Sequence, residues 1–326
     1  MDKLAEIDRK ILMSLSLYYH PLYSDGLDRT ARFPGDRYRL LKEKLCQFDE
    51  GKGIKIKTPR LAKFSELCLV HEEEYVSRFL EGSLSEKEIR RIGLKPWKAE
   101  IIPRTLRLVG GALDGLEELL KGAKIAANMA GGTHHAFRGE GAGYCIFNDL
   151  AVCAEVALQR KGIERILVLD LDVHQGDGTA EIFYGDDRVY TVSLHGQNNF
   201  PFRKKTSDFD YGFEDGTGDE EYLRVLDVTL SRLENEQFDL LFFQAGVDGL
   251  ASDALGLLNL SPQGMKERNR RVFEWQRKQG KPMLIFMGGG YAKPIGDTVD
   301  AFADLFLMAA EKLSESAGLD YGINCG

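Results

Sequence analysis

The stretch from residue 165 to 178, Arg-Ile-Leu-Val-Leu-Asp-Leu-Asp-Val-His-Gln-Gly-Asp-Gly, constrains the fold more than any other part of the chain. Its apolar first half is typical of a strand buried on both faces of a parallel sheet. Asp170, Asp172 and His174 then follow at alternate positions, so in an extended chain their side chains point to one side. Burying three such groups is costly unless something pairs them. A divalent metal would do so, since carboxylate and imidazole are ordinary zinc ligands. The alternative is a strand end with solvated acidic groups.

The rest of the chain alternates between short apolar runs and amphipathic segments. After residue 124 the apolar runs predict strands at 124–127, 165–170, 189–195, 239–244 and 282–287, with helices between them. Before residue 124 the pattern predicts helices at 1–17, 35–47, 71–80 and 101–120, an edge strand around 54–56 and a charged surface insertion at 83–98. Residues 196–218 are expected to form a long polar loop. Repeated strand–helix units predict an α/β fold, in which an open, mostly parallel sheet is flanked by helices. With no repeat or linker evident, residues 1–326 are expected to form a single domain.

Polar residues cluster directly after each predicted strand. Because the carboxyl ends of parallel strands meet at one edge of the sheet, and ligands bind there in open α/β sheets, these clusters are expected to form one site. They lie at 131–135, 170–177, 193–195, 244–248 and 288–291.

Charge and cysteine content exclude several classes of protein. The net charge of −8 and the lack of a basic run argue against nucleic acid as a direct partner. An acidic surface favours cationic substrates only weakly. No apolar run approaches the ~18 residues of a membrane span, and no signal peptide is evident. The five cysteines include no Cys-x-x-Cys pair, so neither a disulfide framework nor a thiolate zinc site is indicated. We expect a cytoplasmic protein that does not enter a membrane.

Four of the six histidines lie at the predicted strand ends. His134 and His135 stand side by side in Gly-Gly-Thr-His-His-Ala. Adjacent imidazoles can transfer protons if a carboxylate orients each of them. Asp170 and Asp177 are the available carboxylates.

Five motifs follow one another along the chain: Gly-Gly-Thr-His134-His135-Ala, Asp170-Leu-Asp172-Val-His174-Gln-Gly-Asp177-Gly, Thr191-Val-Ser193-Leu-His195, Gln244-Ala-Gly-Val-Asp248 and Gly288-Gly-Gly-Tyr291. Together they resemble the zinc-dependent histone deacetylase family, within the arginase/deacetylase superfamily, and they occur in that family's order. The resemblance covers the chain from about residue 18 to 303. Two further segments, 219–223 and 260–264, look most like class IV and its bacterial relatives.

The resemblance implies a role for each matching residue. One catalytic Zn²⁺ would be held by Asp172, His174 and Asp248, which leaves a position open for water and substrate. The implied catalytic residues are His135 as general base, oriented by Asp177, then His134 as its electrostatic partner, oriented by Asp170, and Tyr291 as a hydrogen-bond donor to the oxyanion.

The resemblance also implies one or two structural K⁺ ions and a tunnel for the acyl-lysine. The inner K⁺ site matches Asp170, Asp172, His174, Ser193 and Leu194. Phe183 and Val189 match part of an outer site, where Asp186 stands in place of a frequent threonine. The tunnel matches Gly143 and Tyr144, with Phe200 or Phe202 as the opposite wall.

Two features of the family have no clear counterpart. Residues 93–104 contain no match for the acidic rim residue that grips the substrate backbone, so recognition of a peptide main chain is not indicated. Either Arg32 or Arg37 could serve the internal channel below the site, or be structural.

The sequence therefore predicts a zinc-dependent amide hydrolase that removes acetyl or other acyl groups from lysine side chains or related amines. The substrate could instead be a small molecule such as an acetylpolyamine. Two alternatives remain: an arginase-like binuclear manganese hydrolase, whose Asp-x-His-x-Asp order differs from Asp-x-Asp-x-His here, and a non-catalytic binding protein. The acyl chain length, zinc or iron as the metal in the cell, and the oligomeric state stay open.

Overall fold

The computed structural model describes residues 14–48 and 53–315. Its centre is one eight-stranded sheet in which every neighbouring pair of strands is parallel. In spatial order the strands are β2 (Ile54–Lys57), β1 (Leu15–Tyr18), β3 (Ile125–Asn128), β8 (Met283–Phe286), β7 (Leu240–Gln244), β4 (Ile166–Asp170), β5 (Val189–Gly196) and β6 (Phe209–Phe213). The predicted α/β fold is confirmed, and the sheet is wholly parallel.

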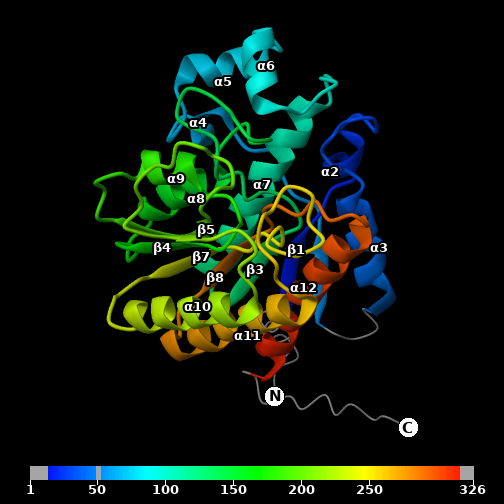
Figure 1. The fold of residues 1–326 in the computed structure, drawn as a ribbon. Coiled ribbons are helices and arrows are strands. Elements are labelled where there is room, and N and C mark those ends of the chain that lie inside the picture. The colour runs from blue at the N-terminus through cyan, green and yellow to red at the C-terminus, as the bar shows by residue number, and fades with distance from the viewer. Residues whose placement is uncertain (1–13, 49–52, 316–326) are drawn as a thin grey trace.

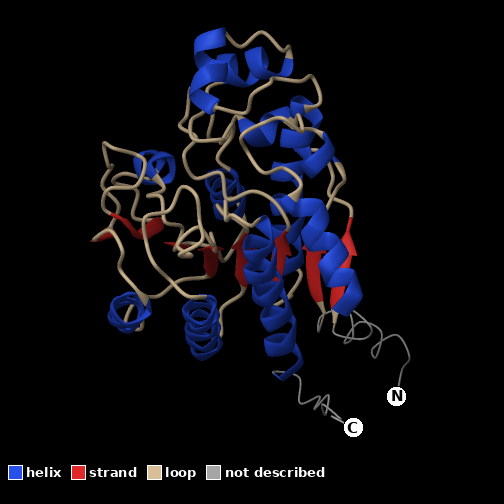
Figure 2. Ribbon diagram, turned by 45° about the vertical axis from the view of Figure 1, so that its right-hand side comes forward, coloured by secondary structure: helices blue, strands red, loops and turns tan. Residues whose placement is uncertain are grey.

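Helices cover both faces of the sheet (Figures 1 and 2). On one side lie α7 (Ile101–Leu120), α8 (Asp149–Leu158) and α9 (Asp177–Ile182), and on the other α10 (Asp219–Leu233), α11 (Pro262–Gln279) and α12 (Ile295–Glu315), with α3 (Arg37–Phe48) beside α12. Beyond α7 lie α4 (Phe64–Leu67), α5 (Glu73–Leu80) and α6 (Glu86–Ile92), and α2 (Leu22–Asp25) follows β1. None of the helices in the described part of the chain is both long and apolar enough to cross a membrane.

Local sequence explains where several helices begin. Ser261 accepts a hydrogen bond from the Gly264 N–H (2.9 Å), and Pro262 occupies the first helical position of α11, as predicted. Asn148 caps α8 in the same way through the Ala151 N–H (3.0 Å). Both caps satisfy N–H groups that have no partner inside the helix.

Two predictions about the strands were wrong. Residues 15–17 were expected to close a helix but form β1, because all four residues of this strand are buried and pair with β2 on one side and β3 on the other. The rest of that expected helix, residues 1–13, lies outside the described residues. The expected loop 196–218 contains β6, which extends the sheet edge beyond β5.

Candidate active site

Strand pairing brings the polar motifs to one edge of the sheet. Asp170, the last residue of β4, pairs in register with Ser193 on β5 and Gln244 on β7. The chain after β4 turns at once, because the Asp170 carboxylate accepts the N–H of Asp172 (3.1 Å). His174 then follows on the same side as Asp172, and the turn after β7 brings Asp248 to meet them. Residues up to 78 positions apart in sequence are thus gathered by the order β7-β4-β5 alone.

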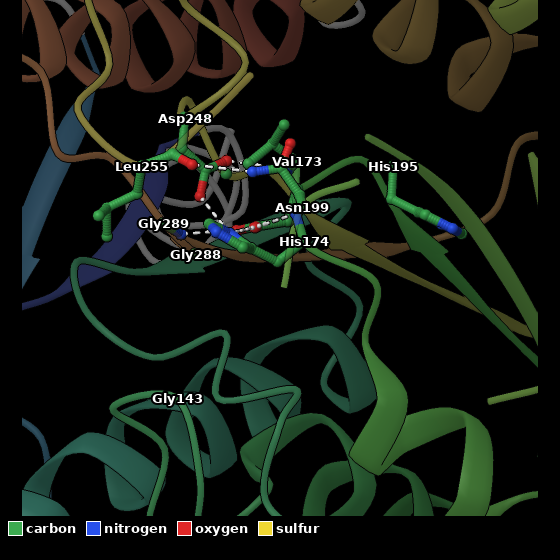
Figure 3. Close-up of polar contacts among 12 residues, drawn as sticks. Gly143, Val173, His174, His195, Asn199, Asp248, Leu255, Gly288 and Gly289 are labelled. Carbon is green, nitrogen blue, oxygen red and sulfur yellow. Dashed lines mark hydrogen bonds and ion pairs between the residues drawn. The ribbon is translucent and has the colours of Figure 1, made fainter. Parts of the chain in front are cut away.

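Asp172, His174 and Asp248 form a cluster whose ligand atoms lie within 4.8 Å of one another. His174 Nδ1 is 3.0 Å from Asp172 Oδ1 and 3.0 Å from Asp248 Oδ2. Figure 3 shows His174 and Asp248 facing each other, with Val173 and Gly289 beside them. The Val173 N–H donates to Asp248 (2.9 Å) and the Gly289 N–H donates to Asp172 (2.7 Å), so the second oxygen of each carboxylate is held in place.

The donor set of this cluster fits a divalent metal ion. Asp172 is 1% exposed and Asp248 is 0% exposed, and burial followed by the charge of Asp172 raises the pKa of Asp248. The ligand oxygens of these two buried carboxylates lie within 4.8 Å of each other, so the carboxylates repel each other unless a cation lies between them. The surrounding backbone also approaches very closely: a Cβ on Gly289 would lie 1.9 Å from Asp248 Oδ2, and one on Gly246 would lie 2.1 Å from Asp172 Oδ2. Only glycine fits at these two positions.

The tandem histidines each face one carboxylate. His134 Nδ1 lies 2.7 Å from Asp170 Oδ2, and His135 Nδ1 lies 2.6 Å from Asp177 Oδ1. The two rings are 4.1 Å apart between centroids. With both Nδ1 atoms engaged, each Nε2 is left toward the metal cluster and the cavity.

The two imidazoles differ in their affinity for a proton. Burial lowers the pKa of His134, but the charges of Asp170 and Asp172 and the hydrogen bond to Asp170 outweigh burial and raise it to about 9. Burial, helped by the positive charge of His134, lowers the pKa of His135 to about 4 despite its bond to Asp177. At neutral pH these two pKa shifts favour a protonated His134 beside a neutral His135, which can accept a proton.

The loop that carries these histidines is fixed by buried polar groups. The Asp149 carboxylate accepts the N–H of Gly132 (3.0 Å) and of Thr133 (2.7 Å). Asn148, besides capping α8, donates to the carbonyl of Ala136 (3.2 Å). In turn the Asn148 N–H donates to His71 Nε2 (2.9 Å). The histidine pair is thus attached to the start of α8 and to the segment before α5.

Tyr291 stands on the loop after β8, with its ring centroid 6.4 Å from that of His174. Its N–H donates to the Asp253 carboxylate (2.6 Å), and its ring packs against Phe33 (6.0 Å). Arg37 lies 5.5 Å from the centre of the Tyr291 ring. Burial raises the pKa of the Tyr291 phenol well above its usual value, so the hydroxyl keeps its proton and can donate it in a hydrogen bond.

A cavity of about 880 Å³ leads to this cluster. His135, His174 and Tyr291 line its inner end, and Gly143, Tyr144 and Phe200 line its walls. Phe200 packs edge-on against His135 (4.9 Å), and a Cβ on Gly143 would lie 2.6 Å from the His135 ring and 3.0 Å from Phe200. Phe200 therefore lies opposite Gly143, whereas the side chain of Phe202 is 87% exposed at the outer end.

The residues matched to the potassium sites lie beside β4. Asp170 on β4 pairs in register with Ser193 on the adjacent strand β5. Leu194 follows on β5, and its side chain is buried. At the expected outer site, Asp186 forms an ion pair with Arg188 (2.6 Å) and its N–H donates to the Phe183 carbonyl (2.9 Å). The carbonyl of Asp186 also accepts the Val189 N–H (3.1 Å), so these groups already have partners within the protein.

The structure separates the two arginine candidates for the internal channel. Arg37 is buried and donates to the carbonyls of Gly288 (3.0 Å) and Gly290 (2.8 Å), beneath the tyrosine loop. Arg32 is exposed and lines the outer cavity instead.

Sequence reasoning missed His71, Asp149 and Asp253, which hold the functional loops in place. Asp149 could have been noticed because it directly follows Asn148, the N-cap residue of α8. His71 and Asp253 carry no such local signal, because they contact Asn148 and Tyr291, which lie far away in the sequence.

Comparison with known proteins agrees with this geometry. Residues 32–304 match the model of the histone deacetylase domain. A protein of Picosynechococcus sp., described as uncharacterized, is 42% identical over 288 residues, covering 88% of this chain and 95% of its own. Histone deacetylase 2 of Arabidopsis thaliana is 29% identical over 309 residues (89% and 79% covered), and histone deacetylase 8 of Xenopus tropicalis is 30% identical over 280 residues (79% and 72% covered). The chain belongs to the histone deacetylase family.

Membership of the histone deacetylase family supports an amide hydrolase of the deacetylase type and implies a metal cofactor. The buried cluster of Asp172, His174 and Asp248 is the group in the described part of the chain arranged to hold it. The position of the chain within the family, in class IV or among its bacterial relatives, stays a prediction.

Proposed function

We propose that this protein is a zinc-dependent hydrolase that removes acetyl or other acyl groups from lysine side chains or related amines. The observation that carries the proposal is the convergence of three groups on one buried point: the Asp172–His174–Asp248 cluster, His135 held by Asp177, and Tyr291. A site that only bound a ligand would have no use for both a proton acceptor and an oxyanion donor.

The chemistry follows from the positions of the side chains. Asp172, His174 and Asp248 would hold the metal, which when bound polarises a carbonyl oxygen and makes water a stronger acid. His135 takes the proton of the attacking water on Nε2, while Asp177 at Nδ1 stabilises the imidazolium that forms. The same proton then passes to the leaving nitrogen, so that one amide and one water become a carboxylate and an amine.

The other two catalytic residues act through charge. Tyr291 donates its hydroxyl hydrogen to the carbonyl oxygen as that oxygen becomes negative. His134, kept protonated beside Asp170, stabilises negative charge at the reacting centre without exchanging a proton.

Potassium at the inner site, held by Asp170, Asp172, His174, Ser193 and Leu194, is part of the same proposal. The support for it is burial: Asp170 is 4% exposed and Ser193 is 2% exposed, on adjacent paired strands. A monovalent cation there would offset the charge of Asp170.

A binuclear manganese hydrolase fits less well. Such a site needs further carboxylates bridging two ions, and among the described residues a single three-residue cluster is arranged to hold a metal.

The test is release of free amine from three substrates: an acetyl-lysine peptide, a long-chain acyl-lysine peptide and an acetylated polyamine. Each is assayed with metal-replete protein, with Tyr291→Phe and with the control Tyr184→Phe, whose side chain is 75% exposed. We expect turnover of at least one substrate, a loss of roughly 10²–10³ in kcat for Tyr291→Phe, and no loss for the control. Turnover that survives Tyr291→Phe, or zinc-loaded protein that hydrolyses none of the three, would contradict the proposal.

A further inference from the structure

The mouth of the active-site cavity carries four cationic side chains. They are Arg32, Arg91, Arg203 and Lys205. Within the described residues, the one acidic side chain lining the same cavity is Asp177, which is buried and already bonded to His135. The mouth is therefore basic in a chain whose net charge is −8.

Two of these cations have carboxylate partners and two have none. Arg91 forms an ion pair with Glu140 (2.6 Å), and Lys205 forms one with Glu181. Arg32 and Arg203 are exposed, and no carboxylate of the described residues lies within ion-pair distance of either. Their guanidinium groups are the ones available to a substrate.

The backbone that carries Arg32 is fixed by its neighbour. Phe33 is 6% exposed and packs against Tyr144 (5.2 Å between centroids) and Tyr291 (6.0 Å). Because Phe33 touches both the cavity wall and the proposed oxyanion donor, Arg32 is held at the rim of the reacting site.

Hydrogen bonds within the loop that carries Arg203 hold that loop in place. The Lys204 ammonium donates to the carbonyls of Asn199 (2.6 Å) and Pro201 (2.7 Å), which closes the loop on itself. The Asn199 side chain, 3% exposed, donates to the carbonyl of Leu255 (2.8 Å), which also lines the cavity; both residues are labelled in Figure 3. Arg203 is thus presented by an anchored segment.

We propose that this mouth selects substrates that carry a carboxylate on the part that stays at the rim when the acylated amine is bound inside the cavity. The inference rests on the proposed function and names its substrate class. A guanidinium binds a carboxylate through two parallel hydrogen bonds as well as by charge, and two such groups stand free at the rim. The carboxylate could be the α-carboxylate of an acyl-lysine or an acidic residue beside acyl-lysine in a peptide. Acetylpolyamines carry positive charge and are repelled by the same groups.

The experiment compares kcat/KM for matched substrates at low salt. Three acetyl-lysine peptides differ only in their flanking residues, which are aspartate, glycine or lysine. A second pair, acetyl-lysine with a blocked α-amine as the free acid or as the amide, separates the small-molecule source from the peptide source. The protein is assayed unchanged, as Arg32→Ala with Arg203→Ala, as Arg203→Glu, and as Arg224→Glu, an exposed control on α10.

We expect the acidic member of at least one set to be preferred about two- to thirtyfold over the neutral member, the range given by two exposed charge pairs. The preference disappears in the double alanine variant, inverts toward the lysine-flanked peptide in Arg203→Glu, and is unchanged in Arg224→Glu. It also shrinks in 1 M salt, where the screening length is about 3 Å.

The outcomes separate this inference from the proposed function. Equal rates for acidic and neutral substrates, with turnover that still depends on Tyr291, would overturn the charge selection and leave the deacylase intact. A preference that survives loss of both arginines would overturn it as well. Zinc-loaded protein that hydrolyses no member of either set would overturn both.

Discussion

The free energy of unfolding is expected to fall as the pH drops from 6.5 toward 4, because the fold holds His71 in its neutral form. His71 Nδ1 lies 2.9 Å from the Phe137 carbonyl, so it must carry hydrogen, and Nε2 accepts the Asn148 N–H (2.9 Å), so it must not. A second proton would place two donors face to face. Burial is the largest cause that lowers the pKa of His71 from 6.5 to about 4, and its backbone hydrogen bonds only partly oppose it.

The sign and size of the effect follow from proton linkage. Because the folded pKa lies below the unfolded one, the unfolded chain binds the proton more readily between these two values. The stabilisation is complete above pH 6.5 and is lost as the pH falls toward 4. Between pH 7.5 and 5, a shift from 6.5 to about 4 corresponds to about 2 kcal/mol of unfolding free energy.

The assay is denaturant unfolding of the unchanged protein and of His71→Gln at several pH values. Gln keeps an oxygen that can accept the Asn148 N–H and does not titrate, and other titrating groups cancel in the difference between the two proteins. We expect the difference in unfolding free energy between the unchanged protein and His71→Gln to be largest at pH 7.5 and to become about 2 kcal/mol smaller at pH 5. Two curves that run parallel across this range would refute the reasoning.

Two further predictions concern the loop after β8. A Cβ at Gly289 would lie 1.9 Å from Asp248 Oδ2, so Gly289→Ala is expected to lower the amount of zinc that the protein retains after gel filtration, measured by metal analysis. The control is Gly296→Ala, because a Cβ at Gly296 meets nothing within 4 Å. Equal zinc retention in the two variants would contradict this prediction. Arg37→Met leaves the carbonyls of Gly288 and Gly290 without the donor that Arg37 supplies and is expected to cost about 2–4 kcal/mol in unfolding free energy. The control is Arg39→Met, at an exposed arginine. If Arg37→Met lowers the free energy of unfolding no more than Arg39→Met does, the buried guanidinium is not needed for stability.

Most of the fold could be read from the sequence after residue 124, because most strands there are short apolar runs and helices separate most of them. Before that point the signal is weaker. Residues 15–18 could not be told from part of a helix, since a strand of four residues is too short to stand out from the helical pattern that precedes it. The strand β6 was missed because its residues are mostly polar or aromatic and form one edge of the sheet.

The sequence by itself determined which groups gather at the site. The alternate spacing of Asp170, Asp172 and His174 pointed to one shared site, although β4 ends at Asp170 and a turn carries the other two. Parallel pairing sends the ends of β4, β5, β7 and β8 to one edge of the sheet. The order of the motifs and the pairing of parallel strands can both be read without coordinates.

Only the tertiary structure decided which side chains hold that site and which face the substrate. Arg32 and Arg37 are five residues apart and chemically identical, yet one is exposed at the cavity mouth and the other is buried under the tyrosine loop. His71 meets Asn148, 77 residues later in the chain. Such contacts depend on how separate elements pack together, and no short-range pattern in a sequence records that packing.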